Sequence, residues 1–130
     1  MSLQIDKSEL PLTLDLWSIL VLAVPSFIYQ LGYAAVSEEP LFRGFLWGYL
    51  RKLKCPEKWI WLFQTGLFML GHIYYVTNAP VSFWIIVPVG GLVTGWLAWR
   101  SRSIATSMAA HGALNALGRT VGYIFAYSRL

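Results

Sequence analysis

Residues 37–44 read Ser-Glu-Glu-Pro-Leu-Phe-Arg-Gly and place two adjacent carboxylates, Glu38 and Glu39, inside an apolar region. A charge-free run, residues 16–37, leads into the pair, and another apolar segment, residues 45–50, follows Gly44. A carboxylate at membrane depth costs roughly 2.5–3.5 kcal/mol on insertion scales. The pair therefore needs a role. The simpler role is an ion pair that fixes helix packing, and the alternative is catalysis.

The composition indicates one integral membrane domain. The chain has 130 residues, of which 57% are hydrophobic and 12% are charged, whereas soluble domains average about 25% charged residues. The net charge of +4 does not point to nucleic acid, because Lys and Arg gather mainly at the ends of apolar runs, as the positive-inside rule expects. Cys55 is the single cysteine, which excludes an intrachain disulfide and a cysteine-based zinc site.

The hydropathy pattern predicts an all-α, polytopic transmembrane helix bundle with four long helices and a shorter helix that bears the diacid. Residues 1–15 form a polar lead without the basic start of a signal peptide, and residues 16–130 form the single transmembrane core. Ser37 is expected to cap the shorter helix. The expected helices are 16–36, 38–53, 57–76, 81–99 and 103–127.

Two basic turns, 51–58 and 100–102, divide these helices. Alternating helices place both turns on one side of the membrane, which we assign to the cytoplasm. Asn78 then faces the other side. Two pairs of glycines spaced by four, Gly91 with Gly95 and Gly118 with Gly122, predict close helix packing.

The first basic turn relates a carboxylate to a histidine. Glu38 and His72 lie at equal sequence distances on either side of Cys55, which is at the centre of this turn. If both arms are helical and antiparallel, the two side chains reach similar depth, because the rise per residue is the same in both arms. The sequence alone does not show that the helix faces carrying Glu38 and His72 point toward each other.

The last predicted helix carries a polar stripe. Ser107, His111, Asn115 and Arg119 are spaced by four and therefore share one face, which must contact other protein or a water-filled cavity. One convergent polar site is the economical inference. Its members would be Glu38, Glu39, Arg43, His72, His111, Asn115 and Arg119.

Each of these residues also has a simpler interpretation. Glu39 and Arg43 are spaced i, i+4 and suit a structural ion pair. A lone histidine inside a membrane is often a hydrogen-bonding core residue. Arg119 suits a structural or snorkelling role, and Phe68, one turn before His72, suits packing.

Three motifs follow in order. Residues 38–43 fit EExxxR, residues 68–72 fit FxxxH, and residues 111–115 fit HxxxN. In this order, with Gly44 after the first, they resemble the motifs of the CPBP family of CAAX proteases and bacteriocin-processing enzymes, also called the Abi family. The family includes type II CAAX prenyl endopeptidases and myxosortase-like proteases of the protein-sorting branch. The resemblance covers residues 37–117.

The resemblance implies a glutamic-type intramembrane endopeptidase with no metal and no cofactor. Glu38 would activate water with help from His72, and His111 and Asn115 would stabilise the oxyanion. Glu39 and Arg43 would position Glu38, and the residues alone do not choose between the two glutamates as the base. The implied partners are the lipid bilayer and a membrane-anchored protein or peptide, cleaved near a C-terminal membrane segment or tail.

Two alternatives stay open. The protease could be a zinc enzyme, with Glu38, His72 and His111 as ligands. The chain could instead be a non-enzymatic membrane module, such as an immunity protein, a scaffold or a proton relay. Because members of the family are usually longer, a homo-oligomer or a substrate helix would be needed to close the cavity. The expected location is a multi-pass position in the cell or inner membrane.

Overall fold

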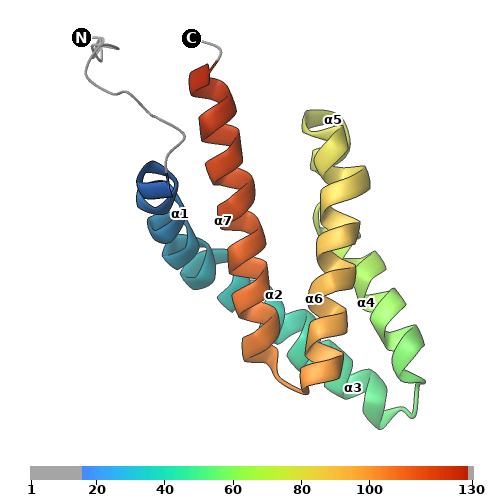
Figure 1. Cartoon of the computed structure of the whole chain (residues 1–130). Coiled ribbons are helices and arrows are strands. Elements are labelled where there is room, and N and C mark those ends of the chain that lie inside the picture. The colour runs from blue at the N-terminus through green and yellow to red at the C-terminus, as the bar shows by residue number, and fades with distance from the viewer. Residues whose placement is uncertain (1–15, 129–130) are drawn as a thin grey trace.

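The computed structural model describes residues 16–128 as helices joined by short turns, with no strand in this range (Figure 1). This confirms the predicted all-α fold class. The polar lead, residues 1–15, lies outside the described residues.

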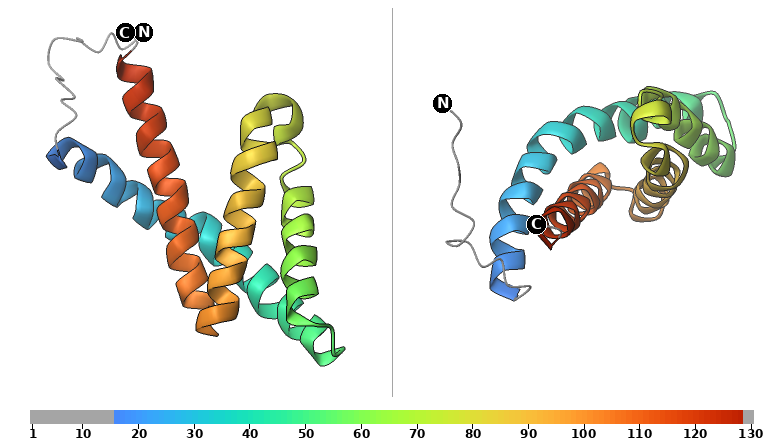
Figure 2. Two further views of the ribbon diagram at one scale, coloured as in Figure 1. Left: turned by 45° about the vertical axis from the view of Figure 1, so that its right-hand side comes forward. Right: turned by 90° about the horizontal axis from the view of Figure 1, so that it is seen from above.

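The first 37 described residues form one continuous helix. At 1.5 Å per residue its length is about 55 Å, well above the roughly 30 Å hydrocarbon core of a bilayer. It runs obliquely behind the helices of the C-terminal half (Figures 1 and 2). Its segments are α1 (Leu16–Gln30), η2 (Leu31–Ala35), α2 (Val36–Glu39), η3 (Pro40–Leu46) and α3 (Trp47–Lys52).

The predicted helix break at Ser37 is therefore wrong. The Ser37 hydroxyl donates to the carbonyls of Tyr33 at 2.8 Å and Ala34 at 3.0 Å, in its own preceding turn. A serine bonded in this way continues a helix and does not cap a new one. Pro40 is accommodated because the helix widens into π-helical turns in η2 and η3, and such turns are frequent at functional sites.

The second half of the chain begins with α4, which ends earlier than the sequence suggests. Its last residue is Gly71, whereas the expected helix reached Val76. His72 Nδ1 lies 2.8 Å from the carbonyl oxygen of Phe68, the acceptor that the backbone amide of His72 would use in an α-helix. That amide bonds to Met69 instead. The helix therefore ends where the imidazole, and not the backbone amide of His72, bonds to the Phe68 carbonyl.

Four further helical segments, α5, η4, α6 and α7, follow α4 and complete the fold. A turn leads from α4 into the short α5, and the chain then returns antiparallel to α4 before the last helix. The bounds are α4 (Glu57–Gly71), α5 (Tyr75–Asn78), η4 (Ser82–Ile86), α6 (Val87–Ser101) and α7 (Ile104–Ser128).

Both basic turns lie at the same end of the molecule, as the sequence predicts (Figures 1 and 2). Across the first turn, Glu57 accepts hydrogen bonds from Arg51 Nε at 2.6 Å and Trp47 Nε1 at 2.7 Å. The hydrogen bond from Arg51 is the main reason that the pKa of Glu57 lies below its ordinary value. This contact ties the end of the long helix to the start of α4.

Glycines bring α4 and α6 together. A Cβ on Gly91 would lie 3.1 Å from Thr65 Cγ2, and a Cβ on Gly95 would lie 2.4 Å from Gln64 Nε2. The packing role predicted for this pair is confirmed. The same prediction for Gly118 and Gly122 is wrong, since a Cβ on either would meet no described atom within 4 Å.

The outer surface of the described helices is largely apolar. Large side chains that are more than half exposed include Ile28, Phe45, Trp84, Ile85 and Phe125. Two helices, Leu16–Lys52 and Ser82–Ser101, are long and apolar enough to cross a membrane. An apolar exterior around a small polar interior is the pattern expected of a lipid-embedded chain.

We expect Gly95→Ala to destabilise the protein by about 1–3 kcal/mol, because the added methyl would overpack the contact with Gln64 and Trp61. Gly90→Ala is the matched control on the same helix, since its Cβ meets nothing within 4 Å. It should be neutral or stabilising by up to about 1 kcal/mol. Thermal unfolding in detergent measures both. Equal midpoints for the two variants would contradict the packing described.

Candidate functional site

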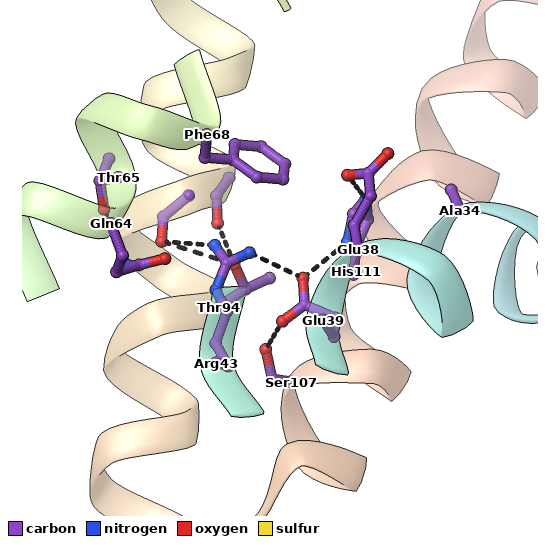
Figure 3. Close-up of polar contacts among 12 residues, drawn as sticks. Ala34, Glu38, Glu39, Arg43, Gln64, Thr65, Phe68, Thr94, Ser107 and His111 are labelled. Atoms are coloured by element: carbon purple, nitrogen blue, oxygen red, sulfur yellow. Dashed lines mark hydrogen bonds and ion pairs between the residues drawn. The ribbon is translucent and has the colours of Figure 1, made fainter. Parts of the chain in front are cut away.

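A buried ion pair lies at the centre of the described structure. Glu39 and Arg43 have side chains that are 0% exposed, and Glu39 Oε1 accepts from Arg43 Nη1 at 3.1 Å. Arg43 Nη2 also donates to Thr94 Oγ1 at 2.7 Å and to the carbonyl of Gly91 at 3.1 Å. The guanidinium therefore joins the long helix to α6 (Figure 3).

The carboxylate of Glu39 joins the same helix to α7. Its Oε1 lies 2.7 Å from His111 Nδ1, and its Oε2 accepts a short hydrogen bond from the hydroxyl of Ser107. Both oxygens of Glu39 therefore have partners, and the carboxylate has no free face toward a substrate. Three helical segments meet at this one ion pair.

His111 connects the two glutamates. Its Nδ1 faces Glu39, and its Nε2 lies 3.8 Å from Oε2 of Glu38. Because the ionised Glu39 can only accept, we assign the Nδ1 hydrogen to this bond, which leaves Nε2 directed at Glu38. The separation between Nε2 and Glu38 is too long for a direct hydrogen bond.

Glu38 differs from its neighbour in its surroundings. Its side chain is 29% exposed, and its Oε2 is buried with no hydrogen-bond partner among residues 16–128. Successive helix residues point about 100° apart, so Glu38 faces a cavity while Glu39 faces the helix contact. Glu38 is thus the carboxylate that is available for chemistry.

The cavity has a volume of about 470 Å³ and lies between the diverging helices α6 and α7. Both helices and the long first helix contribute to its walls, as does the end of α4. Its polar lining includes residues that the sequence predicts, namely Glu38, His72, His111, Asn115 and Arg119.

His72 enters this cavity from the end of α4. A carbonyl only accepts, so the bond to Phe68 assigns a hydrogen to His72 Nδ1. In the neutral ring, Nε2 then keeps its lone pair. The ring lies 4.6 Å from the Phe68 ring, centre to centre. The packing role predicted for Phe68 is confirmed, because this side chain is 5% exposed and also lies 4.8 Å below the Arg43 guanidinium.

Asn115 and Arg119 lie further along α7. Asn115 Nδ2 donates to Gln30 Oε1 at 3.3 Å, which leaves its second amide hydrogen for another acceptor. Arg119 lies 5.6 Å above the ring of Tyr29 and donates to the hydroxyl of Tyr123 at 3.3 Å. The stripe spaced by four therefore faces protein and cavity as far as Asn115, and Arg119 at its outer end lines the cavity but is exposed.

Sequence reasoning missed Gln30 and Thr94. Both are buried, and both bind a residue that the motifs contain. A lone amide such as Gln30 inside a charge-free run does carry a signal, since a polar group at membrane depth needs a partner. Thr94 gave no comparable signal, because a threonine can satisfy its hydroxyl on its own helix.

A zinc site was the alternative arrangement of Glu38, His72 and His111. Within residues 16–128, no three His, Cys, Asp or Glu side chains are grouped so that they could hold a metal ion. His111 Nδ1 is engaged with Glu39 and His72 Nδ1 with a backbone carbonyl. A metal could therefore bind these two histidines only through their Nε2 atoms.

An apolar helical exterior around a polar cavity and a buried ion pair defines the class of the chain as a membrane-embedded helical protein. A family model described as type II CAAX prenyl endopeptidase Rce1-like matches residues 17–117, and the chain belongs to this family. The resemblance to CAAX proteases seen in the motifs is thereby confirmed. No curated protein and no solved structure shows significant similarity to the chain.

We expect Thr94→Val to destabilise the protein by about 1–3 kcal/mol, because it removes a buried acceptor from Arg43. Thr120→Val is the matched control, since the Thr120 hydroxyl is buried without a hydrogen-bond partner among the described residues. That change should be neutral or stabilising. Unfolding midpoints in the same detergent measure both. A Thr94 variant as stable as the Thr120 variant would show that the Arg43 contact contributes nothing.

Proposed function

We propose that the chain is a glutamic-type intramembrane endopeptidase in which Glu38 activates a water molecule. The observation that carries the proposal is the buried Oε2 of Glu38, which lacks a partner in the described part of the chain and lies 3.8 Å from His111 Nε2. Both oxygens of the neighbouring Glu39 are already bound. Membership of a CAAX protease family supports the reaction class.

In the proposed reaction, the water molecule lies between Glu38 and His72. Glu38 takes one proton as the water oxygen attacks the carbonyl carbon of the substrate, and His72 Nε2 orients the water by accepting its other hydrogen. Glu38 then returns the proton to the leaving amine as the C–N bond breaks. Atoms and charge balance without a cofactor.

The developing oxyanion needs donors on the opposite side. Asn115 can give its second amide hydrogen, because its first is held by Gln30. His111 presents its Nε2 to the same region, because its Nδ1 is held by Glu39. Donors placed in this way contribute about 3–4 kcal/mol each in soluble proteases.

The proposed substrate is a membrane-anchored protein or peptide that is cleaved near a C-terminal membrane segment or tail. The cavity lies among helices with an apolar exterior, so a substrate already held in the bilayer reaches it without crossing water. We place the basic turns on the cytoplasmic side and propose a multi-pass arrangement of the long helices.

The test is cleavage of a fluorescence-quenched peptide with an apolar C-terminal tail by purified protein in detergent. We expect Glu38→Gln to lower turnover by roughly 10²–10⁴-fold, the range for losing a general base. Glu57→Gln is the control, because Glu57 is the first residue of α4 and does not line the cavity. Wild-type turnover in the Glu38 variant would contradict the proposal.

A strong chelator separates the glutamic from the zinc mechanism. Activity that survives the chelator supports water activation by Glu38 alone. Activity that is lost and then restored by zinc would assign Glu38, His72 and His111 to a metal. If variants at these positions kept the full biological effect of the protein, a non-enzymatic module would be the better description.

A further inference from the structure

Gln30 is a buried amide on the wall of the cavity. The residue is 7% exposed, and it lines the cavity together with Glu38 and Asn115. It lies in the charge-free run, residues 16–37, where a buried polar group costs free energy unless it gains a hydrogen-bond partner. Its oxygen Oε1 has such a partner, because Asn115 Nδ2 donates to it at 3.3 Å.

The π-helical turn η2 helps to bring Gln30 and Glu38 to the same side of the long helix. The two residues are eight positions apart, and in a regular α-helix eight residues rotate about 80° past two full turns. η2 lies between them, at Leu31–Ala35. Its i→i+5 hydrogen bonding fits more residues into a turn, so each residue rotates less and the two faces come closer into line. Both side chains line one cavity, and so does Ala34, which lies between them in the sequence.

The long helix holds two side chains of α7 in the same way. Glu39 Oε1 lies 2.7 Å from His111 Nδ1, and Gln30 Oε1 accepts from Asn115 Nδ2 one turn further along α7. In each pair, an oxygen of the long helix engages one nitrogen-bound hydrogen of the α7 residue. His111 keeps its Nε2 and Asn115 keeps its second amide hydrogen for other partners.

We propose that Gln30 is a positioning residue that orients the Asn115 amide toward the oxyanion of the substrate. This inference rests on the proposed peptidase function. The terminal torsion of an asparagine is broad, so an unheld amide would point at the oxyanion in only part of its conformations. The bond to Gln30 fixes the plane of the amide, and the second hydrogen then has one direction. Donors that are preorganised in this way stabilise the transition state without reorganising during the reaction. Gln30 acts through Asn115 and needs no contact with the substrate.

The first experiment measures turnover of the quenched peptide in detergent. Gln30→Met keeps the length of the side chain and removes the acceptor for Asn115. We expect kcat to fall roughly 3- to 15-fold, the effect of one hydrogen bond, with KM nearly unchanged. Gln30→Glu keeps an acceptor oxygen and should recover part of this loss. Gln64→Met is the matched control and should leave kcat unchanged, because Gln64 is also a buried amide but does not line the cavity.

A double-mutant cycle separates positioning from a structural role. In an Asn115→Ala background, Gln30→Met should lower kcat by less than about 2-fold, because the side chain that it orients is gone. If Gln30 only stabilised the fold, the substitution would lower kcat by the same factor in both backgrounds. That result would overturn the inference, as would a lower unfolding midpoint with no change in kcat.

Binding of a phosphinate peptide distinguishes this inference from the proposed function. A phosphinate at the scissile position carries an anionic oxygen on a tetrahedral centre and imitates the oxyanion. We expect wild-type protein to bind it roughly 10²-fold or more tightly than the same peptide with a methylene in that place. Gln30→Met should reduce this preference roughly 3- to 15-fold, and Gln64→Met should not change it.

The outcomes assign failure to one proposal or the other. Cleavage that depends on Glu38, together with the same phosphinate preference in wild-type and Gln30→Met protein, would overturn the role of Gln30 and leave the peptidase standing. The absence of any phosphinate preference in wild-type protein would also overturn that role. A lack of cleavage, together with a preference that depends on Gln30, would leave the amide pair standing and remove the peptidase.

Discussion

The burial of one ion pair constrains the rest of this structure. Glu39 and Arg43 are 0% exposed, and the effective cost of removing two charges from water is several kcal/mol for each ion. Their attraction offsets this cost only when further hydrogen bonds satisfy the remaining oxygens and hydrogens. Ser107 and His111 on α7, and Thr94 on α6, provide those bonds. The positions of α6 and α7 are therefore tied to the hydrogen bonds that Glu39 and Arg43 require.

That constraint gives the two adjacent glutamates different roles. On a helix, neighbouring residues cannot face the same contact, so the residue that completes the ion pair leaves the other directed elsewhere. Glu39 is consumed by the packing of three helical segments, and Glu38 reaches the cavity with an unpartnered oxygen in the described structure. The two adjacent carboxylates are therefore not equivalent. Glu39 belongs to the buried ion pair, and Glu38 lines the cavity.

The sequence predicts the parts of this arrangement that depend on simple geometry. Spacing by four placed Ser107, His111 and Asn115 on one face, and counting from the basic turn brought Glu38 and His72 to one cavity. The prediction from Ser37 was wrong, because a serine hydroxyl can cap a new helix or bond to the preceding turn of a continuing one, and the local sequence does not decide between them. Gln30 could have been found, whereas Thr94 becomes informative only once Arg43 lies beside it.

The two histidines show how the fold assigns different chemistry to one residue type. Each has its Nδ1 held by an acceptor of the chain, and each therefore offers Nε2. The acceptor of His72 is a neutral carbonyl, which it gains by ending α4, whereas the acceptor of His111 is a buried carboxylate. In the proposed reaction, His72 accepts a hydrogen bond from water and His111 faces the oxyanion. The helix end at Gly71 and the ion pair at Arg43 are thus two parts of one arrangement around Glu38.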